Sequence, residues 1–147
     1  MRRGEQVLLL RGAPQKRLWP NHYNGVGGHI ERGEDVLSAA QRELKEETGL
    51  IADWLRLVGT ITIDAGPEVG IVVFVLTGEC KDGEVNPSHE GSLEWVPAKE
   101  ISSYPLVEDL YTILPRILAM QPGDPPFSYR YHYDDEDILV ITDKSVY

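Results

Sequence analysis

The sequence is poor in cysteine and has no long apolar run. Cys80 is the only cysteine among 147 residues, so no intramolecular disulfide can form, and its apolar neighbours favour core packing over a reactive thiol. No run reaches the ~20 apolar residues that span a bilayer, and no signal peptide opens the chain. We therefore expect a cytoplasmic protein with no membrane partner.

Basic residues are also scarce, since 14 Lys and Arg stand against 24 Asp and Glu and give a formal net charge of −10. Nucleic acid polymers need a basic surface, so this balance argues against such a partner. An acidic protein that binds phosphates needs cations, and Mg²⁺ held by carboxylates supplies them. The length and a hydrophobic content of 41% predict one globular domain over residues 1–147.

Short apolar or alternating runs, bounded by turn residues, predict the strands. We expect strands at residues 6–10, 25–30, 55–63, 69–80, 92–96, 127–133 and 137–142, with long hairpins at 55–80 and 127–142. Helical spacing of apolar residues and the stop at Gly49 predict a helix at 35–48. A second helix is expected at 107–120, kinked or restarted at Pro115. This order predicts an α/β (α+β) fold with a mixed β-sheet sandwiched between helices.

Three carboxylates crowd one turn of the first predicted helix. Glu43, Glu46 and Glu47 are spaced i, i+3 and i+4, so they share a face and repel one another. Arg42 and Lys45 are interleaved, but from their own sides of the helix they cannot neutralise the whole triplet. A solvated acidic face is the usual interpretation of such a run, and a divalent cation that removes the repulsion is the alternative.

The segment 28–50, GHIERGEDVLSAAQRELKEETGL, resembles the Nudix box, GX5EX7REUXEEXGU, in which U is a bulky aliphatic residue. All nine fixed positions match: Gly28, Glu34, Arg42, Glu43, Leu44, Glu46, Glu47, Gly49 and Leu50. The resemblance implies a loop–helix–loop catalytic motif that binds Mg²⁺, or Mn²⁺ in its place, while water attacks a phosphorus atom. The glycines of the preceding NGVGG stretch allow close approach of the backbone to this motif.

The same resemblance implies roles for individual residues. Glu43, Glu46 and Glu47 are expected as metal ligands and catalytic residues, with the Gly27 carbonyl as a further ligand. Arg42 is expected to hold a box carboxylate in position. Family members differ in whether a box glutamate or a later one accepts the proton from water, and Glu90 is the later candidate, as a ligand or base.

Substrate residues are predicted from a narrower similarity, to the WNGFGGK stretch of animal Nudix enzymes that hydrolyse 8-oxo-dGTP. Asn24 matches the asparagine that contacts the purine edge, beside Gly28. The pair Glu108–Asp109 resembles an acidic pair that reads the base, although acids at the start of a helix also suit its dipole. Arg11 is a candidate phosphate contact.

The resemblance implies a Nudix hydrolase that converts a nucleoside triphosphate to a monophosphate and diphosphate, with oxidised purines such as 8-oxo-dGTP as candidate substrates. ADP-ribose and dinucleoside polyphosphates are alternatives, as is a non-catalytic module that binds a nucleotide. Only residues 1–4 precede the first predicted strand, where Nudix proteins usually place another. We expect either a start upstream or a sheet edge covered differently, for instance by a partner subunit, so both monomer and homodimer remain open.

Overall fold

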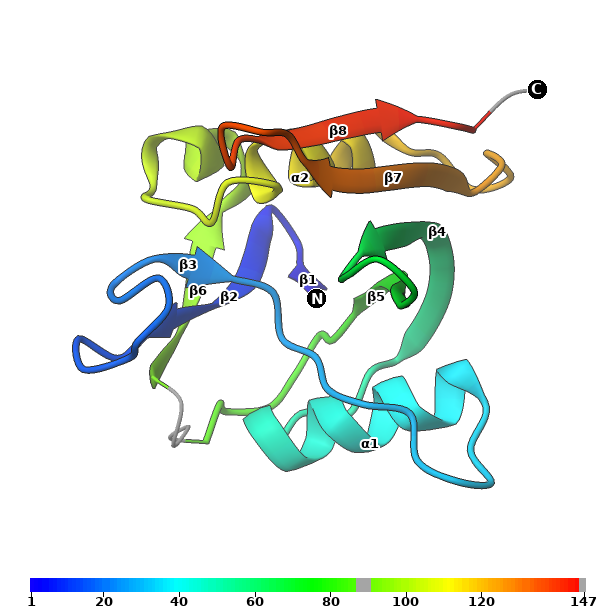
Figure 1. Cartoon of the computed structure of the whole chain (residues 1–147). Coiled ribbons are helices and arrows are strands. Elements are labelled where there is room, and N and C mark those ends of the chain that lie inside the picture. The colour runs from blue at the N-terminus through cyan, green and yellow to red at the C-terminus, as the bar shows by residue number, and fades with distance from the viewer. Residues whose placement is uncertain (87–90, 146–147) are drawn as a thin grey trace.

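The computed structural model describes residues 1–86 and 91–145. Within these residues, eight strands form one mixed sheet in the order β3-β2-β1-β5-β4-β7-β8, and β6 pairs with β2 (Figure 1). The strands are β1 (Arg2–Arg3), β2 (Gln6–Gly12), β3 (Tyr23–Asn24), β4 (Trp54–Asp64), β5 (Gly70–Glu79), β6 (Gly91–Pro97), β7 (Phe127–Tyr133) and β8 (Leu139–Asp143). The helices are α1 (Val36–Thr48), the 3₁₀ helix η1 (Ala98–Ser103) and α2 (Leu110–Ala119).

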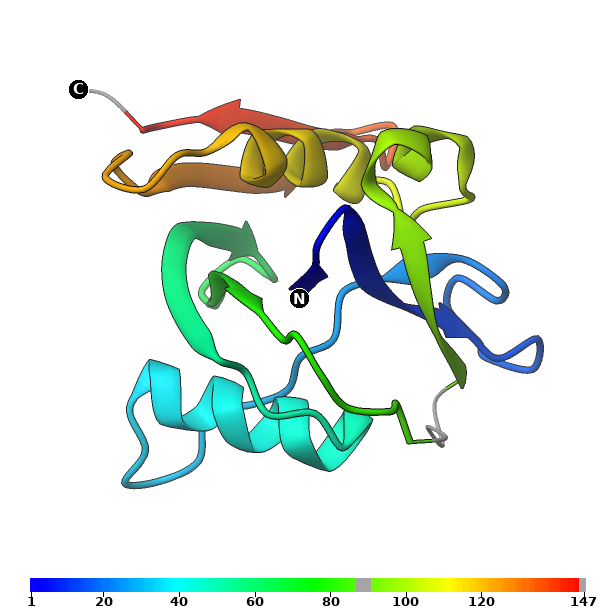
Figure 2. The same cartoon turned by 180° about the vertical axis from the view of Figure 1, so that it is seen from behind.

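The sheet curls between its helices. Figures 1 and 2 show α1 beyond one end of the curled sheet and α2 against β7 and β8 at the other. The short strand β1 joins the two arms, because it pairs antiparallel with β2 and, through Arg2 opposite Glu79, parallel with β5. The predicted mixed sheet between helices is therefore confirmed, and the N-terminal residues belong to the sheet rather than preceding it.

Two groups of buried side chains hold this arrangement together. The larger one packs α2 and η1 against β2, β4 and β7, with Phe127 fully buried at its centre. The smaller one seals α1 onto the sheet through Leu8, Leu44, Leu50 and Cys80. Cys80 is thus a core residue, as its apolar neighbours predicted. No helix in the described ranges has the length and apolar character needed to cross a membrane.

The first predicted helix is confirmed at both ends. The Asp35 carboxylate accepts hydrogen bonds from the backbone N–H groups of Leu37 and Ser38, which caps the start of α1. At the other end Gly49 adopts a φ of 78°, a left-handed conformation that glycine reaches without a steric penalty. Both hairpins are confirmed as well, since β4 pairs with β5 and β7 with β8, each pair antiparallel.

Two predicted elements differ from the structure. The strand expected at 25–30 is wrong: β3 ends at Asn24, and the chain then leaves the sheet to cross toward α1. The second helix begins at Leu110, three residues later than expected, and continues through Pro115 without a restart. Residues 107–109 instead form a turn that bonds to β3, and this competing contact delays the helix.

Gly59 provides a test of the packing at the centre of the sheet. A Cβ atom at this position would overlap the ring of Phe127, which is buried and cannot move aside. We expect Gly59→Ala to lower the free energy of unfolding by about 1–3 kcal/mol, measured by urea denaturation. The matched control is Gly66→Ala, where a Cβ meets nothing within 4 Å. Equal stability of the two variants would contradict this packing.

Candidate active site

Arg42 is the centre of the box. Its guanidinium forms a two-pronged contact with Glu34, from Nε to Oε1 at 2.7 Å and from Nη2 to Oε2 at 2.9 Å. Nη2 also donates to the His29 carbonyl at 3.0 Å, which ties the loop to the helix. The Arg42 guanidinium holds the pKa of Glu34 down at about 2, and Glu34 in turn raises the pKa of Arg42.

The third nitrogen of Arg42 reaches two of the clustered acids. Nη1 donates to Glu43 Oε1 and to Glu46 Oε2, each at 3.1 Å. One nitrogen of Arg42 therefore contacts neighbours at both i+1 and i+4, rather than the single box carboxylate expected from the sequence. The negative charge of the turn is therefore already partly offset, and the two carboxylates share a single positive group.

Glu43 is seated directly against the glycine loop. Its Oε1 accepts a hydrogen bond from the His29 backbone N–H at 3.1 Å, and its side chain is only 18% exposed. A Cβ at Gly28 would overlap the Glu43 carboxylate itself. Glycine at position 28 therefore leaves space for the Glu43 carboxylate rather than supplying an unusual φ, which accounts for the first fixed residue of the box.

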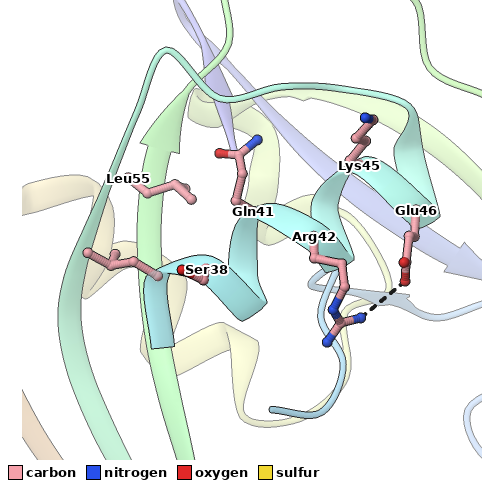
Figure 3. A pocket seen from close by; sticks show the side chains of 7 residues that line it. Ser38, Gln41, Arg42, Lys45, Glu46 and Leu55 are labelled. Atoms are coloured by element: carbon pink, nitrogen blue, oxygen red, sulfur yellow. Dashed lines mark hydrogen bonds and ion pairs between the residues drawn. The ribbon is translucent and has the colours of Figure 1, made fainter. Parts of the chain in front are cut away.

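The remaining two acids border different hollows beside α1. Glu46 is 60% exposed and lines a hollow of about 890 Å³ between α1 and Leu55 of β4, where Figure 3 shows it joined to Arg42. Glu47 lines a separate cavity between the helix and the β2–β3 region. Within residues 1–86 and 91–145, no three His, Cys, Asp or Glu side chains converge as a metal cluster.

The cavity beside Glu47 has a volume of about 500 Å³. Its walls come from β2, β3, the loop between them, the glycine loop and α1, and it is lined by Leu10, Gly12, Lys16, Arg17, Leu18, Trp19, His22, Asn24, Gly25, Gly27, Glu47 and Val107. The side chains thus include one carboxylate, two cationic groups, an amide and apolar surface. Such a mixture of apolar walls and a few polar groups is typical of small-molecule sites.

The loop wall of this cavity is strained. Trp19 has a φ of 48°, in the left-handed region that bulky residues rarely adopt, and Asn21 has a φ of 59°, which asparagine adopts more readily. Strain of this kind persists only where surrounding contacts impose it, and it is frequent at binding sites. The hydrogen bonds from Asn21 N to Gly12 O and from Gly12 N to His22 O, both 3.0 Å, supply that constraint.

Asn24 and Arg11 face opposite sides of the sheet. Asn24 pairs with Leu10, and both residues line the cavity. Arg11 lies between Leu10 and Gly12, and because side chains alternate along a strand it points away, with its guanidinium 6.0 Å from the centre of the Tyr23 ring. The structure therefore brings Asn24, Gly27 and Glu47 to one cavity and leaves Arg11 out of it.

Tyr23 anchors this wall of the cavity. Its backbone N–H donates to the Pro105 carbonyl at 2.8 Å, and its carbonyl accepts from Val107 N–H at 2.9 Å. Its ring is buried, packs edge-on against Tyr104, and its hydroxyl donates to Glu94 at 2.7 Å. Burial and the hydrogen bond to Glu94 raise the pKa of Tyr23. These contacts fasten Asn24 to the segment that leads into Glu108 and Asp109.

Glu108 and Asp109 do not themselves line the cavity, although the preceding Val107 does. Glu108 is exposed, and Asp109 is half-buried at the start of α2 without capping it through its side chain. Burial raises the pKa of Asp109. Burial, together with the nearby Asp109 charge, also raises the pKa of Tyr131. Glu90, the later candidate ligand or base, lies outside the described residues.

Sequence reasoning missed several of these features. Glu34 was recognised only as a fixed box position, whereas its spacing of eight residues from Arg42 places it opposite that guanidinium across the loop. Leu10, Gly12 and His22 were not expected as cavity residues. The alternation of side chains along β2 could have identified Leu10 and Gly12, because Asn24 requires partners on its own face.

The donor set suits a hard divalent cation. Carboxylate oxygens of Glu43, Glu46 and Glu47 and the Gly27 carbonyl are all oxygen donors, which Mg²⁺ and Mn²⁺ prefer to nitrogen or sulfur. Because Gly28 has no Cβ, the Glu43 carboxylate has room beside the loop backbone. Glu46 is exposed and has Arg42 as a partner, so its side chain can turn without disturbing the core.

Comparison with known proteins agrees with this geometry. The NUDIX domain family matches residues 1–117. Oxidized purine nucleoside triphosphate hydrolase of Mus musculus is 28% identical over 138 residues, 92% of this chain and 84% of the mouse protein. The protein of that name from Danio rerio is 31% identical over 94 residues, 63% and 60% of the two chains. The crystal structure of MutT from Bacillus halodurans superposes with a TM-score of 0.81 at 24% identity, covering 99% and 94%.

The mixed curled sheet and the loop–helix–loop box define the Nudix class of hydrolase fold. The chain belongs to the Nudix family. It is a Nudix hydrolase similar to MutT proteins and to oxidized purine nucleoside triphosphate hydrolases, and the family in general uses divalent metal ions.

The contact between Glu34 and Arg42 predicts a pH dependence of stability. Because the folded state lowers the Glu34 pKa from 4.5 to about 2, its contribution is complete above pH 4.5 and is lost as the pH falls toward 2. We expect Glu34→Gln to be less stable than wild type at pH 7, with the difference shrinking between pH 4.5 and 2 in thermal unfolding. Glu31→Gln, a neighbouring exposed acid, is the control. A difference that stays constant with pH would contradict the assignment.

Proposed function

We propose that this Nudix hydrolase converts a purine nucleoside triphosphate to a monophosphate and diphosphate, with Mg²⁺ as the metal. The observation that supports this most is the cavity that places Glu47 of the box beside Asn24, Lys16 and Arg17. One wall supplies a carboxylate that could bind a metal ion, and another supplies cationic side chains that could bind phosphate. A third supplies an amide group that could bind a nucleotide base. The mouse relative, named for oxidized purine nucleoside triphosphates, favours a purine as well.

Mg²⁺ held in this box would polarise a phosphate oxygen and lower the pKa of a bound water. The carboxylates of Glu43, Glu46 and Glu47 and the Gly27 carbonyl would hold it. Arg42 orients Glu43 and Glu46 through the same nitrogen, and Glu34 fixes Arg42 by its two-pronged contact. The chain therefore keeps its acids in position before substrate arrives, so little reorganisation is needed during the reaction. A box glutamate and Glu90 both remain candidates for the general base.

Phosphate and base would lie at opposite ends of the cavity. Lys16 and Arg17, on the loop, are suited to the polyphosphate, and they replace Arg11 in that role because Arg11 points away. Asn24 Oδ1 already accepts from Gly25 N–H at 2.7 Å, which leaves its amide nitrogen to donate to an acceptor on a purine edge. Glu108 and Asp109 do not line the cavity, but we retain them as candidate base contacts, because they follow Val107, which lines it and bonds to Tyr23.

Activity should depend on both the metal and Glu47. We expect Mg²⁺-dependent release of diphosphate from 8-oxo-dGTP or a canonical purine triphosphate, and a loss of at least about 100-fold in kcat/KM for Glu47→Gln, which removes a charged ligand. The panel should include ADP-ribose and diadenosine polyphosphates, with Glu136→Gln, an exposed turn acid, as the matched control. Nucleotide binding without any product would instead support a non-catalytic module. Faster turnover of ADP-ribose would overturn the triphosphate assignment.

Asn24 tests the base-binding end separately. Loss of one neutral hydrogen bond costs about 1 kcal/mol, so Asn24→Ala should raise KM for purine substrates about 5-fold while leaving kcat almost unchanged. Pyrimidine triphosphates serve as the internal control, because a contact to the purine edge is absent there. An equal rise in KM for both classes would remove Asn24 from base recognition.

A further inference from the structure

Trp19 presents an open aromatic ring to the cavity that holds Glu47. Its side chain lines that cavity and is 49% exposed. The ring stacks within residues 1–86 and 91–145 involve other side chains, so no ring of this part of the chain covers the indole. Aromatic side chains bury large apolar areas when they pack, and their faces pair favourably with other rings. An indole left open on a cavity wall is therefore available to a flat ligand.

The backbone around Trp19 is held in place by hydrogen bonds. The Trp19 carbonyl accepts from His22 N–H at 3.2 Å, which closes a four-residue turn, and Pro20 and the positive φ of Asn21 suit the second and third positions of a type II turn. This turn bonds to the end of β2 at Gly12, where a Cβ would lie 3.0 Å from the Trp19 carbonyl oxygen. The loop therefore keeps the Trp19 side chain at the cavity wall in spite of its unfavourable φ.

Trp19 differs in kind from the other groups around the cavity. Among the lining residues that the structure describes, only His22 also carries an aromatic ring, and its Nδ1 lies 2.9 Å from a carbonyl oxygen of its own turn. Leu10 and Val107 supply apolar surface without a flat face. Asn24 supplies hydrogen-bonding groups, which recognise the edge of a base and not its face. The cavity thus combines an edge-binding group with one large flat face, which suits a nucleotide base.

We propose that the indole of Trp19 stacks on the face of the nucleotide base while Asn24 contacts its edge. This inference rests on the proposed function, because it takes a nucleotide as the occupant of the cavity. Every base has a π face, so stacking on an aromatic side chain stabilises bound purines and pyrimidines alike, whereas contacts to the edge distinguish them. Trp19 therefore supplies affinity for any nucleotide base, and Asn24 supplies the preference for a purine.

Non-hydrolysable nucleotides and a probe without a base provide the test. In titration calorimetry with Mg²⁺, we expect Trp19→Ala to weaken binding of α,β-methylene dGTP and α,β-methylene dCTP by about 10-fold each, because both lose the stacking contact. Inorganic tripolyphosphate has no base and should bind equally to wild type and Trp19→Ala. The matched control is Trp54→Ala, which removes an indole that is 44% exposed on β4, outside the cavity, and should change none of these affinities.

A second variant separates stacking from damage to the loop. Trp19→Phe keeps a ring at this position and should bind the analogues within about 3-fold of wild type. The analogues should also quench tryptophan emission in wild type and Trp54→Ala but not in Trp19→Ala. Unchanged analogue binding in Trp19→Ala, or an equal loss of tripolyphosphate binding, would overturn the stacking contact. Analogue binding that depends on Trp19 in a chain that hydrolyses no triphosphate would overturn the proposed function alone, and a wild type that binds no analogue would overturn both.

Discussion

The active site depends on one guanidinium. Arg42 donates to Glu34, Glu43, Glu46 and the His29 carbonyl, so a single side chain fixes the loop, the helix and two of the three clustered acids. Without it, carboxylates spaced within one turn would separate into solvent under their own repulsion. Glu34 accepts two hydrogen bonds on the other side of the guanidinium. Arg42 therefore cannot move toward one carboxylate without losing its hydrogen bond to another. The geometry of the box is therefore set by a shared cation and not by the helix alone.

A second constraint connects this box to the rest of the cavity. Tyr23 bonds through its backbone to Pro105 and Val107 and through its hydroxyl to Glu94, which brings β3, β6 and the approach to α2 to one point. Asn24 follows Tyr23 directly, and the glycine loop follows Asn24. Only Gly25 and Val26 separate Asn24, the proposed base contact, from Gly27, a proposed metal ligand, so covalent geometry limits the distance between these two positions.

The sequence predicted the local features of this molecule well. Asp35 and Gly49 mark the ends of α1, and the β-branched runs mark the β4–β5 hairpin, because capping and alternation are properties of neighbouring residues. The predictions failed where contacts between residues far apart in the sequence determine the local structure. Residues 25–30 look like a strand but cross to Glu43, and Arg11 looked available to phosphate until its position between Leu10 and Gly12 showed which face it occupies.

The contact between Gly28 and Glu43 has a wider consequence for how this protein can diversify. A Cβ at position 28 would meet the far end of the Glu43 side chain, so a larger residue there would move the carboxylate from its present position. The loop that carries Lys16, Arg17 and Trp19 forms another wall of the cavity and lies outside the sequence of the box. New preferences among nucleotides are therefore most accessible through that loop, while the chemistry beneath it stays the same.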